Sequence, residues 1–149
     1  CDEMEEYGVT VLRGEAVNLS TGSGQEIQIC GIDDPEAGAE EQLQQVGGQV
    51  ETGRFSVLLA HRPERMEAYL EYPFDLVVSG HAHGGQWRIP GILNGLIAPN
   101  QGLFPQYAGG QYAFENATLI VSRGLAPEST RVPRIFNRPE VVVIDLTPA

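Results

Sequence analysis

Three histidines are the residues of this 149-residue sequence whose type and spacing best suit chemistry. His81 and His83 stand two positions apart and are followed at once by Gly84 and Gly85, whereas His61 comes earlier in the chain. Neutral imidazole is the commonest protein ligand of transition metals, and a hydrogen bond to its second nitrogen fixes the orientation of the ring. The histidines therefore favour a metal site, provided that the fold brings them together.

Two short apolar runs lead directly to these histidines. Residues 54–60, RFSVLLA, end at His61, and residues 74–80, FDLVVSG, end at His81. Runs of this length and composition are typical of strands that are buried on both faces of a sheet. A short helix, predicted over residues 62–72, links them, and a β-α-β order makes the two strands parallel neighbours. Both strands then end at the sheet edge where ligand sites form.

The HAH segment itself predicts a loop. On a helix, side chains at positions i and i+2 diverge by about 200°, whereas an extended loop turns both rings towards one site. Gly80 precedes the pair, and Gly84 and Gly85 follow it. Glycine permits positive φ and lets the backbone pass close to a metal ion or a bound oxyanion without a Cβ clash.

The first half of the chain predicts further short elements. Strands are expected over residues 9–20 and 26–32, with a Thr-Gly-Ser-Gly turn between them. Asp34 and Pro35 are typical of a helix start, which predicts a helix over residues 35–46.

The second half predicts mostly antiparallel sheet, because short apolar segments alternate with Gly, Pro and Asn. These segments are residues 86–90, 111–114, 117–124 and 140–146. In the helix over residues 62–72, Met66, Tyr69 and Leu70 have the spacing of an inward-facing stripe. The fold class expected is α/β with a mixed sheet and short helices, in a single domain over residues 1–149.

Composition narrows the function classes. Hydrophobic residues make up 42% and charged residues 19%, which is typical of a globular domain. The formal net charge of −11 repels phosphate backbones, so nucleic-acid binding is not expected as the main function. Cys1 and Cys30 are too few for a disulfide framework or a cysteine zinc site. Because no apolar run approaches the ~18 residues of a membrane span, we expect the chain to be soluble. The sequence does not indicate its cellular compartment.

Other candidate groups have simpler structural roles. Asp33 and Asp34 are more typical of a turn and a helix cap than of a metal dyad. Trp87 suits either the wall of a pocket or a buried start of the antiparallel sheet. The serines lack a nucleophile-elbow sequence, and no phosphate-binding Gly-Lys-Ser run occurs. Four arginines near the end, Arg123, Arg131, Arg134 and Arg138, suit either a phosphate contact or exposed loops.

The two histidine segments together carry a family likeness. VLLAHRPE, followed by VVSGHAHGGQ and the closing SRGL and PRIFNRPEVVVIDL, resembles the C-terminal half of the calcineurin-like metallophosphoesterases, in particular a bacterial subgroup with a GHxHGGQ run. The resemblance covers the chain from about Gly8. It implies the C-terminal half of an αββα sandwich and a binuclear centre of two divalent ions, Mn, Fe or Zn.

The resemblance also implies roles for individual residues. His61 and His81 match ligands of one metal ion, and His83 matches a ligand of the other. Gly84, Gly85 and Arg134 are expected to contact the substrate, and Gly80 and Gln86 are weaker candidates for support of the centre. The implied reaction is attack of a metal-activated hydroxide on a phosphomonoester, a phosphodiester or the pyrophosphate bond of a lipid precursor.

Three motifs that the family carries before this region are missing. The sequence has no Asp-x-His, no Gly-Asp and no Asn-His pair. We therefore expect a C-terminal part of a longer hydrolase, cytoplasmic or membrane-associated as a whole, whose absent N-terminal half is its partner. On its own the part should be inactive and should self-associate through the uncovered face. The competing interpretation is a non-catalytic scaffold of the same superfamily.

Overall fold

The computed structural model describes residues 2–20, 22, 24–126 and 133–147 of the chain. Its contacts divide it into two compact units, which are described separately. The first unit contains residues 1–79 and 111–120, and the second contains residues 80–110 and 121–149. Whether the two units fold as one domain stays a prediction.

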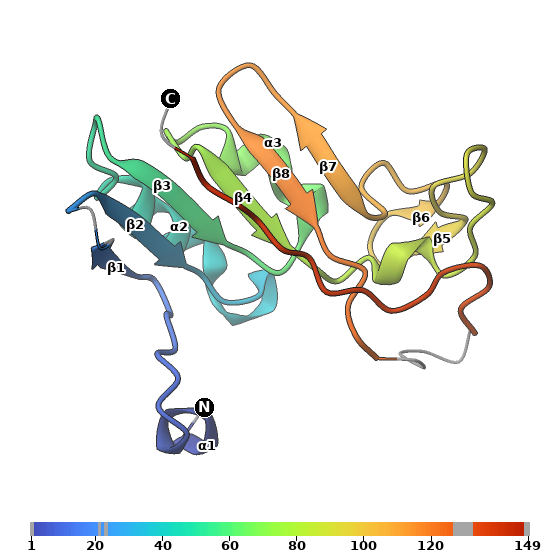
Figure 1. Cartoon of the computed structure of the whole chain (residues 1–149), viewed down its shortest axis with the longest axis horizontal. Helices are drawn as coiled ribbons and strands as arrows, with labels where there is room; N and C mark the ends of the chain where they lie inside the picture. The colour runs from blue at the N-terminus through green and yellow to red at the C-terminus, as the bar shows by residue number, and fades with distance from the viewer. Residues whose placement is uncertain (1, 21, 23, 127–132, 148–149) are drawn as a thin grey trace. The chain divides into compact units, whose positions relative to one another are not determined.

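A six-stranded mixed sheet is the centre of the first unit (Figure 1). The strand order is β1-β2-β3-β4-β8-β7, in which β2, β3 and β4 are parallel and β1 is antiparallel to β2. The strands are β1 (Glu15–Ser20), β2 (Glu26–Gly31), β3 (Phe55–Leu59), β4 (Leu76–Ser79), β7 (Gly110–Ala113) and β8 (Thr118–Val121). The expected mixed α/β class and the parallel β3–β4 pair are confirmed.

The apolar runs form β3 and β4 because they can bury both faces. Leu58 and Val77 are fully buried partners in the parallel ladder. Ser56 is also fully buried, and its hydroxyl donates to Asp75 Oδ2 at 3.0 Å. Asp75 in turn accepts the Ser56 backbone N–H at 2.8 Å. These bonds satisfy polar groups that would otherwise be costly to bury, and they fix the start of β4 against β3.

The two helices that follow β2 and β3 in the chain lie behind the sheet in Figure 1. The predicted helix over residues 35–46 appears as the 3₁₀ turn η1 (Pro35–Ala37) followed by α2 (Ala39–Gly47). Gly38 divides them because its φ of 91° is left-handed and cannot continue a helix. Asp34 caps only the 3₁₀ turn, where its side chain accepts the Glu36 N–H at 3.1 Å.

The second predicted helix is shorter than expected. It consists of η2 (Pro63–Arg65) and α3 (Met66–Tyr69). Met66 and Tyr69 are buried as predicted, but Leu70 is 39% exposed, so its place in the inward stripe was wrong. The first turn is 3₁₀ and α3 ends at Tyr69, which removes the regular 3.6-residue phase that the stripe assumed.

The predicted first strand is also shorter than expected. Residues 9–14 are not extended in a ladder, and β1 begins only at Glu15. The residue before it, Gly14, has a φ of 77°, which interrupts an extended chain. The short α1 (Asp2–Glu6) was not expected from the sequence.

Two of the segments predicted as sheet, residues 111–114 and 117–124, correspond to β7 and β8, whereas most of the second unit consists of short turns. The 3₁₀ turn η3 (His83–Gly85) is followed by a small antiparallel pair, β5 (Ile97–Ala98) and β6 (Gly102–Leu103). Residues 86–90 form no strand and contribute only two isolated bridges, Trp87 with Ile135 and Ile89 with Leu93.

The strand predicted over residues 140–146 was wrong. Its backbone forms no ladder in the part of the chain that the structure describes, and Val141 and Val143 are 74% and 79% exposed. A strand requires a neighbouring backbone to satisfy its N–H and C=O groups, which an apolar sequence cannot supply by itself. None of the described helices combines the length and apolar character needed to span a membrane.

Candidate metal centre

His61 and His81 follow the carboxyl ends of the parallel strands β3 and β4, which lie at the same edge of the sheet. The pairing continues just beyond β3, where the Ala60 N–H donates to the Val78 carbonyl at 3.1 Å, and His61 follows. β4 ends at Ser79, two residues before His81. His61 belongs to the first unit, and His81 and His83 belong to the second. The meeting of all three rings around metal ions therefore stays a prediction.

The histidine loop, residues 81–86, has an unusual backbone. Positive φ values occur at His81 (62°), His83 (49°), Gly84 (65°), Gly85 (65°) and Gln86 (54°). The loop is therefore tightly turned, and the extended form expected from the HAH spacing was wrong. For a residue with a side chain, the left-handed region costs about 1–2 kcal/mol. Such strain persists only where surrounding contacts hold it, and it is concentrated at functional sites.

The two glycines of the loop are required by their protein neighbours. A Cβ on Gly84 would lie 2.3 Å from Asn137 Oδ1, and one on Gly85 would lie 2.4 Å from the Gly95 Cα. From the sequence, these glycines were expected to allow the close approach of a metal ion or an oxyanion. The structure shows that the close neighbours are other parts of the same unit, while contact of the glycines with a substrate stays a prediction.

The loop is held by a buried asparagine that was not predicted from the sequence. Asn137 is 3% exposed, and its side-chain amide donates to the carbonyls of His83 at 2.7 Å and Gln86 at 3.1 Å. These partners are more than fifty residues away in sequence, so no local pattern pointed to them. The only signal was a polar residue placed directly after the apolar pair Ile135 and Phe136.

Residues 133–137, which include Asn137, act as a clamp on the histidine loop, and their hydrogen bonds extend to the two residues that follow the loop. The Ile135 N–H donates to the Gln86 carbonyl at 3.1 Å, and the Arg88 N–H donates to the Ile135 carbonyl at 3.0 Å. Trp87 Nε1 donates to the Pro133 carbonyl at 3.1 Å. Trp87 is 41% exposed and begins no strand, so the buried sheet start considered for it was wrong.

The His81 ring has the environment of a metal ligand. Its Nε2 lies 2.7 Å from Asn100 Oδ1. Because an amide oxygen only accepts, Nε2 carries the proton, and Nδ1 is then the nitrogen with a lone pair in a neutral ring. A second partner that orients the ring in this way is usual for metal-binding histidines. This hydrogen bond is compatible with metal binding by His81, which stays a prediction.

The spacing of the two loop rings and the nearby donors limit what the described residues can hold. The centroids of the His81 and His83 rings are 6.5 Å apart, which suits ligands of two neighbouring ions about 3.5–4 Å apart. Among the residues that the structure describes, no group of three or more His, Cys, Asp or Glu side chains is arranged to hold a metal.

The acidic pair near His61 is structural, as expected. Arg62 donates two hydrogen bonds of 2.8 Å to the Asp34 carboxylate, and this holds the pKa of Asp34 at about 2. Asp33 accepts from Gln42 Nε2 at 3.0 Å. Tyr69, whose hydroxyl donates to the Arg62 carbonyl at 2.9 Å, is buried, and burial raises its pKa. These contacts fix the chain on both sides of the β3 exit.

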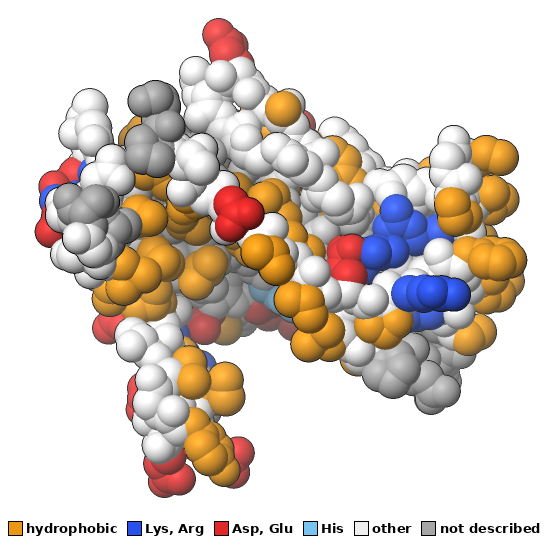
Figure 2. Space-filling view, in the orientation of Figure 1, with side chains coloured by type: hydrophobic (Ala, Val, Ile, Leu, Met, Phe, Trp, Pro, Cys, Tyr) orange, Lys and Arg blue, Asp and Glu red, His pale blue; other side chains and the backbone are white. Residues whose placement is uncertain are grey.

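The predicted arginine cluster is divided between different partners. Arg123 is paired with Glu140 through its backbone N–H and its guanidinium, and this pairing lowers the pKa of Glu140. Arg134 donates to the Arg123 carbonyl at 2.7 Å, Arg138 is exposed, and Arg131 lies outside the described residues. Figure 2 shows arginine side chains gathered over the part of the chain that carries β5 and β6.

Comparison with known proteins identifies relatives along nearly the whole chain. An uncharacterized metallophosphoesterase of Bacillus subtilis, YkuE, is 34% identical over 144 residues, which are 96% of this chain and 48% of the relative. The phosphodiesterase YaeI of Escherichia coli is 30% identical over 97% of this chain and 50% of its own length. The chain spans about half the length of these curated relatives.

A shorter match reaches a protein with a named substrate. The UDP-2,3-diacylglucosamine pyrophosphatase LpxG of Chlamydia muridarum is 33% identical over 93 residues, which are 59% of this chain and 28% of that protein. No family model and no solved structure gives a significant match. The matches to YkuE and YaeI cover 96% and 97% of this chain, and over the part that it covers this chain belongs to the metallophosphoesterase family.

Proposed function

We propose that the protein is a phosphoesterase with a binuclear metal centre to which His61, His81 and His83 contribute ligands. His61 and His81 bind one ion and His83 binds the other. Mn, Fe or Zn suits a set of imidazole and carboxylate ligands. Bound in this way, two ions supply a hydroxide for in-line attack on phosphorus. The observation that carries the proposal is the strained loop that Asn137 and Asn100 hold around two histidines.

Each of the chain's own groups has a defined task in this proposal. Asn100 fixes the tautomer of His81 so that Nδ1 faces the ion, and Asn137 fixes the backbone that carries His83. The backbone N–H groups of Gly84 and Gly85 neutralise the oxygens of the reacting phosphate, and Arg134 contacts another part of the substrate. The substrate is a phosphomonoester or a phosphodiester, or the pyrophosphate bond of a lipid precursor, as the name of the Chlamydia relative indicates for that protein.

We also propose that the remaining ligands come from a part of the protein outside these 149 residues. This is supported by the lack of a three-ligand cluster among the described residues and by the half-length match to the relatives. A preparation of residues 1–149 with added Mn²⁺ should therefore hydrolyse no phosphoester. Appreciable turnover by that preparation would contradict this part of the proposal.

The proposal is tested on the full natural chain with single His61→Ala, His81→Ala and His83→Ala variants. We measure bound metal by elemental mass spectrometry and hydrolysis of p-nitrophenyl phosphate and bis-p-nitrophenyl phosphate. Each variant should lose metal and turnover, whereas Gln45→Ala, on the exposed side of α2, should change neither. Unchanged metal content in all three histidine variants would overturn the metal centre. A wild-type protein that binds metal but hydrolyses neither ester would instead support the scaffold class.

A further inference from the structure

The second unit carries more positive charge than the rest of the chain. It contains five arginines and three acidic residues, a net of +2, although the whole chain has a net charge of −11. One of those acidic residues, Glu140, is already bound by Arg123. The other arginines of this unit therefore outnumber the acidic residues that remain within it.

Arg134 has two buried guanidinium nitrogens without a hydrogen-bond acceptor. Its Nη2 donates to the Arg123 carbonyl at 2.7 Å, but its Nε and Nη1 are buried without an acceptor. Burial and the nearby positive charge of Arg123 lower the pKa of Arg134. Buried donors of a charged group are costly to leave unbonded, and a bound anion is one way in which a protein satisfies them.

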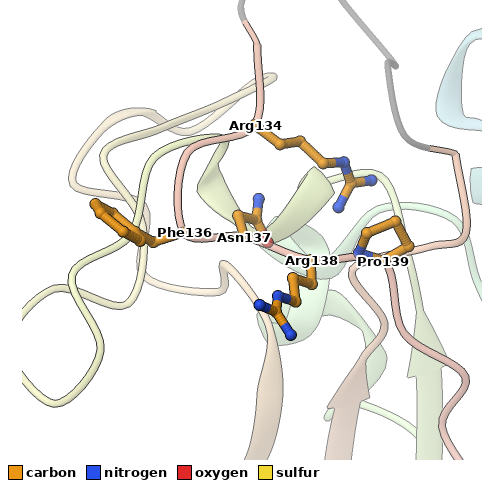
Figure 3. Close-up of a pocket in the computed structure, with 5 residues that line it drawn as sticks. All are labelled: Arg134, Phe136, Asn137, Arg138 and Pro139. Atoms are coloured by element: carbon orange, nitrogen blue, oxygen red, sulfur yellow. The ribbon is translucent and has the colours of Figure 1, made fainter.

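A hollow lies next to this side chain. It has a volume of about 340 Å³ and is lined by Arg134, Phe136, Asn137, Arg138 and Pro139. Figure 3 shows the five residues on one stretch of chain, with the Phe136 ring turned away from both guanidinium groups. The volume falls at the lower end of small-molecule sites, which span about 300–1,000 Å³. Two arginines on one small hollow are the donors that a phosphate prefers.

One residue that lines the hollow also contacts the histidine loop. Asn137, one of its lining residues, donates to the carbonyls of His83 and Gln86. Its Oδ1 is buried without a partner and is the atom nearest to a Cβ built on Gly84. An anion in the hollow is therefore separated from the loop by a single side chain.

We propose that this hollow is an oxyanion site that binds a phosphate group through Arg134 and Arg138. The proposal requires the side chain of Arg134 to turn its unbonded edge to the hollow, where phosphate oxygens would supply the absent acceptors. The site deepens the proposed phosphoesterase function and rests on it for its role, because the bound phosphate is a non-reacting group of the ligand whose scissile bond lies at the histidine loop.

The binding step is tested without metal, so that it does not depend on the proposed centre. The full natural chain in excess EDTA is titrated with inorganic phosphate, and amide shifts are followed in ¹H–¹⁵N spectra. The wild-type protein should show saturable shifts confined to residues 134–138. Arg134→Gln should raise the Kd for phosphate roughly tenfold or more, and Arg138→Gln should raise it by a smaller factor.

Two variants control for charge and for folding. Arg65→Gln removes a charge of the same kind from an arginine paired with Glu40, and should leave the Kd unchanged. Arg138 is exposed, so its variant reports on the site even if Arg134→Gln fails to fold. Equal Kd values for wild type, Arg134→Gln and Arg138→Gln, or shifts elsewhere than residues 134–138, would overturn the site.

A last arm distinguishes a free phosphate group from a lipid headgroup. Vesicles of phosphatidylcholine with or without phosphatidylglycerol are mixed with the protein and sedimented. Binding of inorganic phosphate without cosedimentation supports a soluble phosphate group, and cosedimentation that requires phosphatidylglycerol and Arg134 supports a headgroup in the same hollow. If the protein binds phosphate but no metal, the proposed metal centre is contradicted and the oxyanion site is supported.

Discussion

The two units of the chain use charge in opposite ways. The first unit carries 17 acidic residues and four arginines, a net of −13, and each of those arginines is within an ion-pair distance of a carboxylate. In the second unit, which has a net of +2, Arg123 is paired with Glu140, and Arg134 and Arg138 line the hollow. The first unit therefore uses its arginines to hold its own loops, whereas the second keeps positive charge beside the histidine loop.

Backbone strain follows the same division. The non-glycine residues with positive φ include His81, His83 and Gln86, and every such residue that the structure describes lies beyond Ser79 in the second unit. The first unit buries regular strands, whose ladders satisfy the backbone without strain. The strands of the first unit are thus regular, whereas the loop that carries His81 and His83 is strained and held by hydrogen bonds.

The largest stability effect should come from the sheet of the first unit. Leu58→Ala removes a fully buried side chain between β2 and β4, and should lower the free energy of unfolding by about 2–5 kcal/mol. Urea denaturation measures this change. Leu19→Ala, on the exposed side of β1, is the matched control and should cost far less. Similar losses for both variants would contradict a core centred on β3.

The loop should depend most on Asn137. Asn137→Ala removes two hydrogen bonds to loop carbonyls and should lower stability by about 1–3 kcal/mol. Because outer contacts orient metal ligands, it should also weaken metal binding by the full natural chain roughly 10–100-fold, as measured by calorimetry. Asn116→Ala, exposed in the first unit, should change neither quantity. If a folded Asn137→Ala protein bound metal as tightly as wild type, the hydrogen bonds of Asn137 would not be needed to orient the metal ligands.

Gly84 distinguishes strain from steric contact. Gly84→Ala places a Cβ 2.3 Å from Asn137 Oδ1 at a φ of 65°, whereas Gly53→Ala meets no atom at a φ of 88°. The control should cost about 1–2 kcal/mol from backbone conformation alone. The Gly84 variant should cost more, because Asn137 must also move. If urea denaturation gave the same loss of unfolding free energy for both variants, the contact with Asn137 would add no cost, and the steric explanation would be contradicted.

The smallest effect should be the pH dependence of the first unit. Arg62 holds the pKa of Asp34 at about 2, below its ordinary value of 3.8. The pair therefore stabilises the fold above about pH 4, and this contribution is lost as pH falls through 2. Arg62→Gln should raise the midpoint of acid unfolding and cost about 1 kcal/mol or less at pH 7, because the pair is partly solvated. A midpoint equal to wild type would contradict the assignment.

Local patterns predicted the elements whose formation needs only short-range information. Residues 54–60 and 74–80 are apolar enough to be buried on both faces, and they became β3 and β4. The same reasoning failed for residues 140–146, whose apolar character is equal but whose backbone has no ladder partner among the described residues. Leu70 failed because a 3₁₀ turn changed the helical phase. Self-association of the chain stays a prediction, which light scattering after gel filtration would test.

The sequence by itself determined the alternation of apolar strands and turn residues, and with it the exit of His61 and His81 from the same edge of a parallel pair. Tertiary structure alone decided how the loop is held. Asn100 and Asn137 bond to it across many residues, and the hollow beside Arg134 forms from the returning C-terminal stretch. Periodicity reports which residues prefer to be buried, but a hydrogen bond between distant segments exists only once the chain has folded.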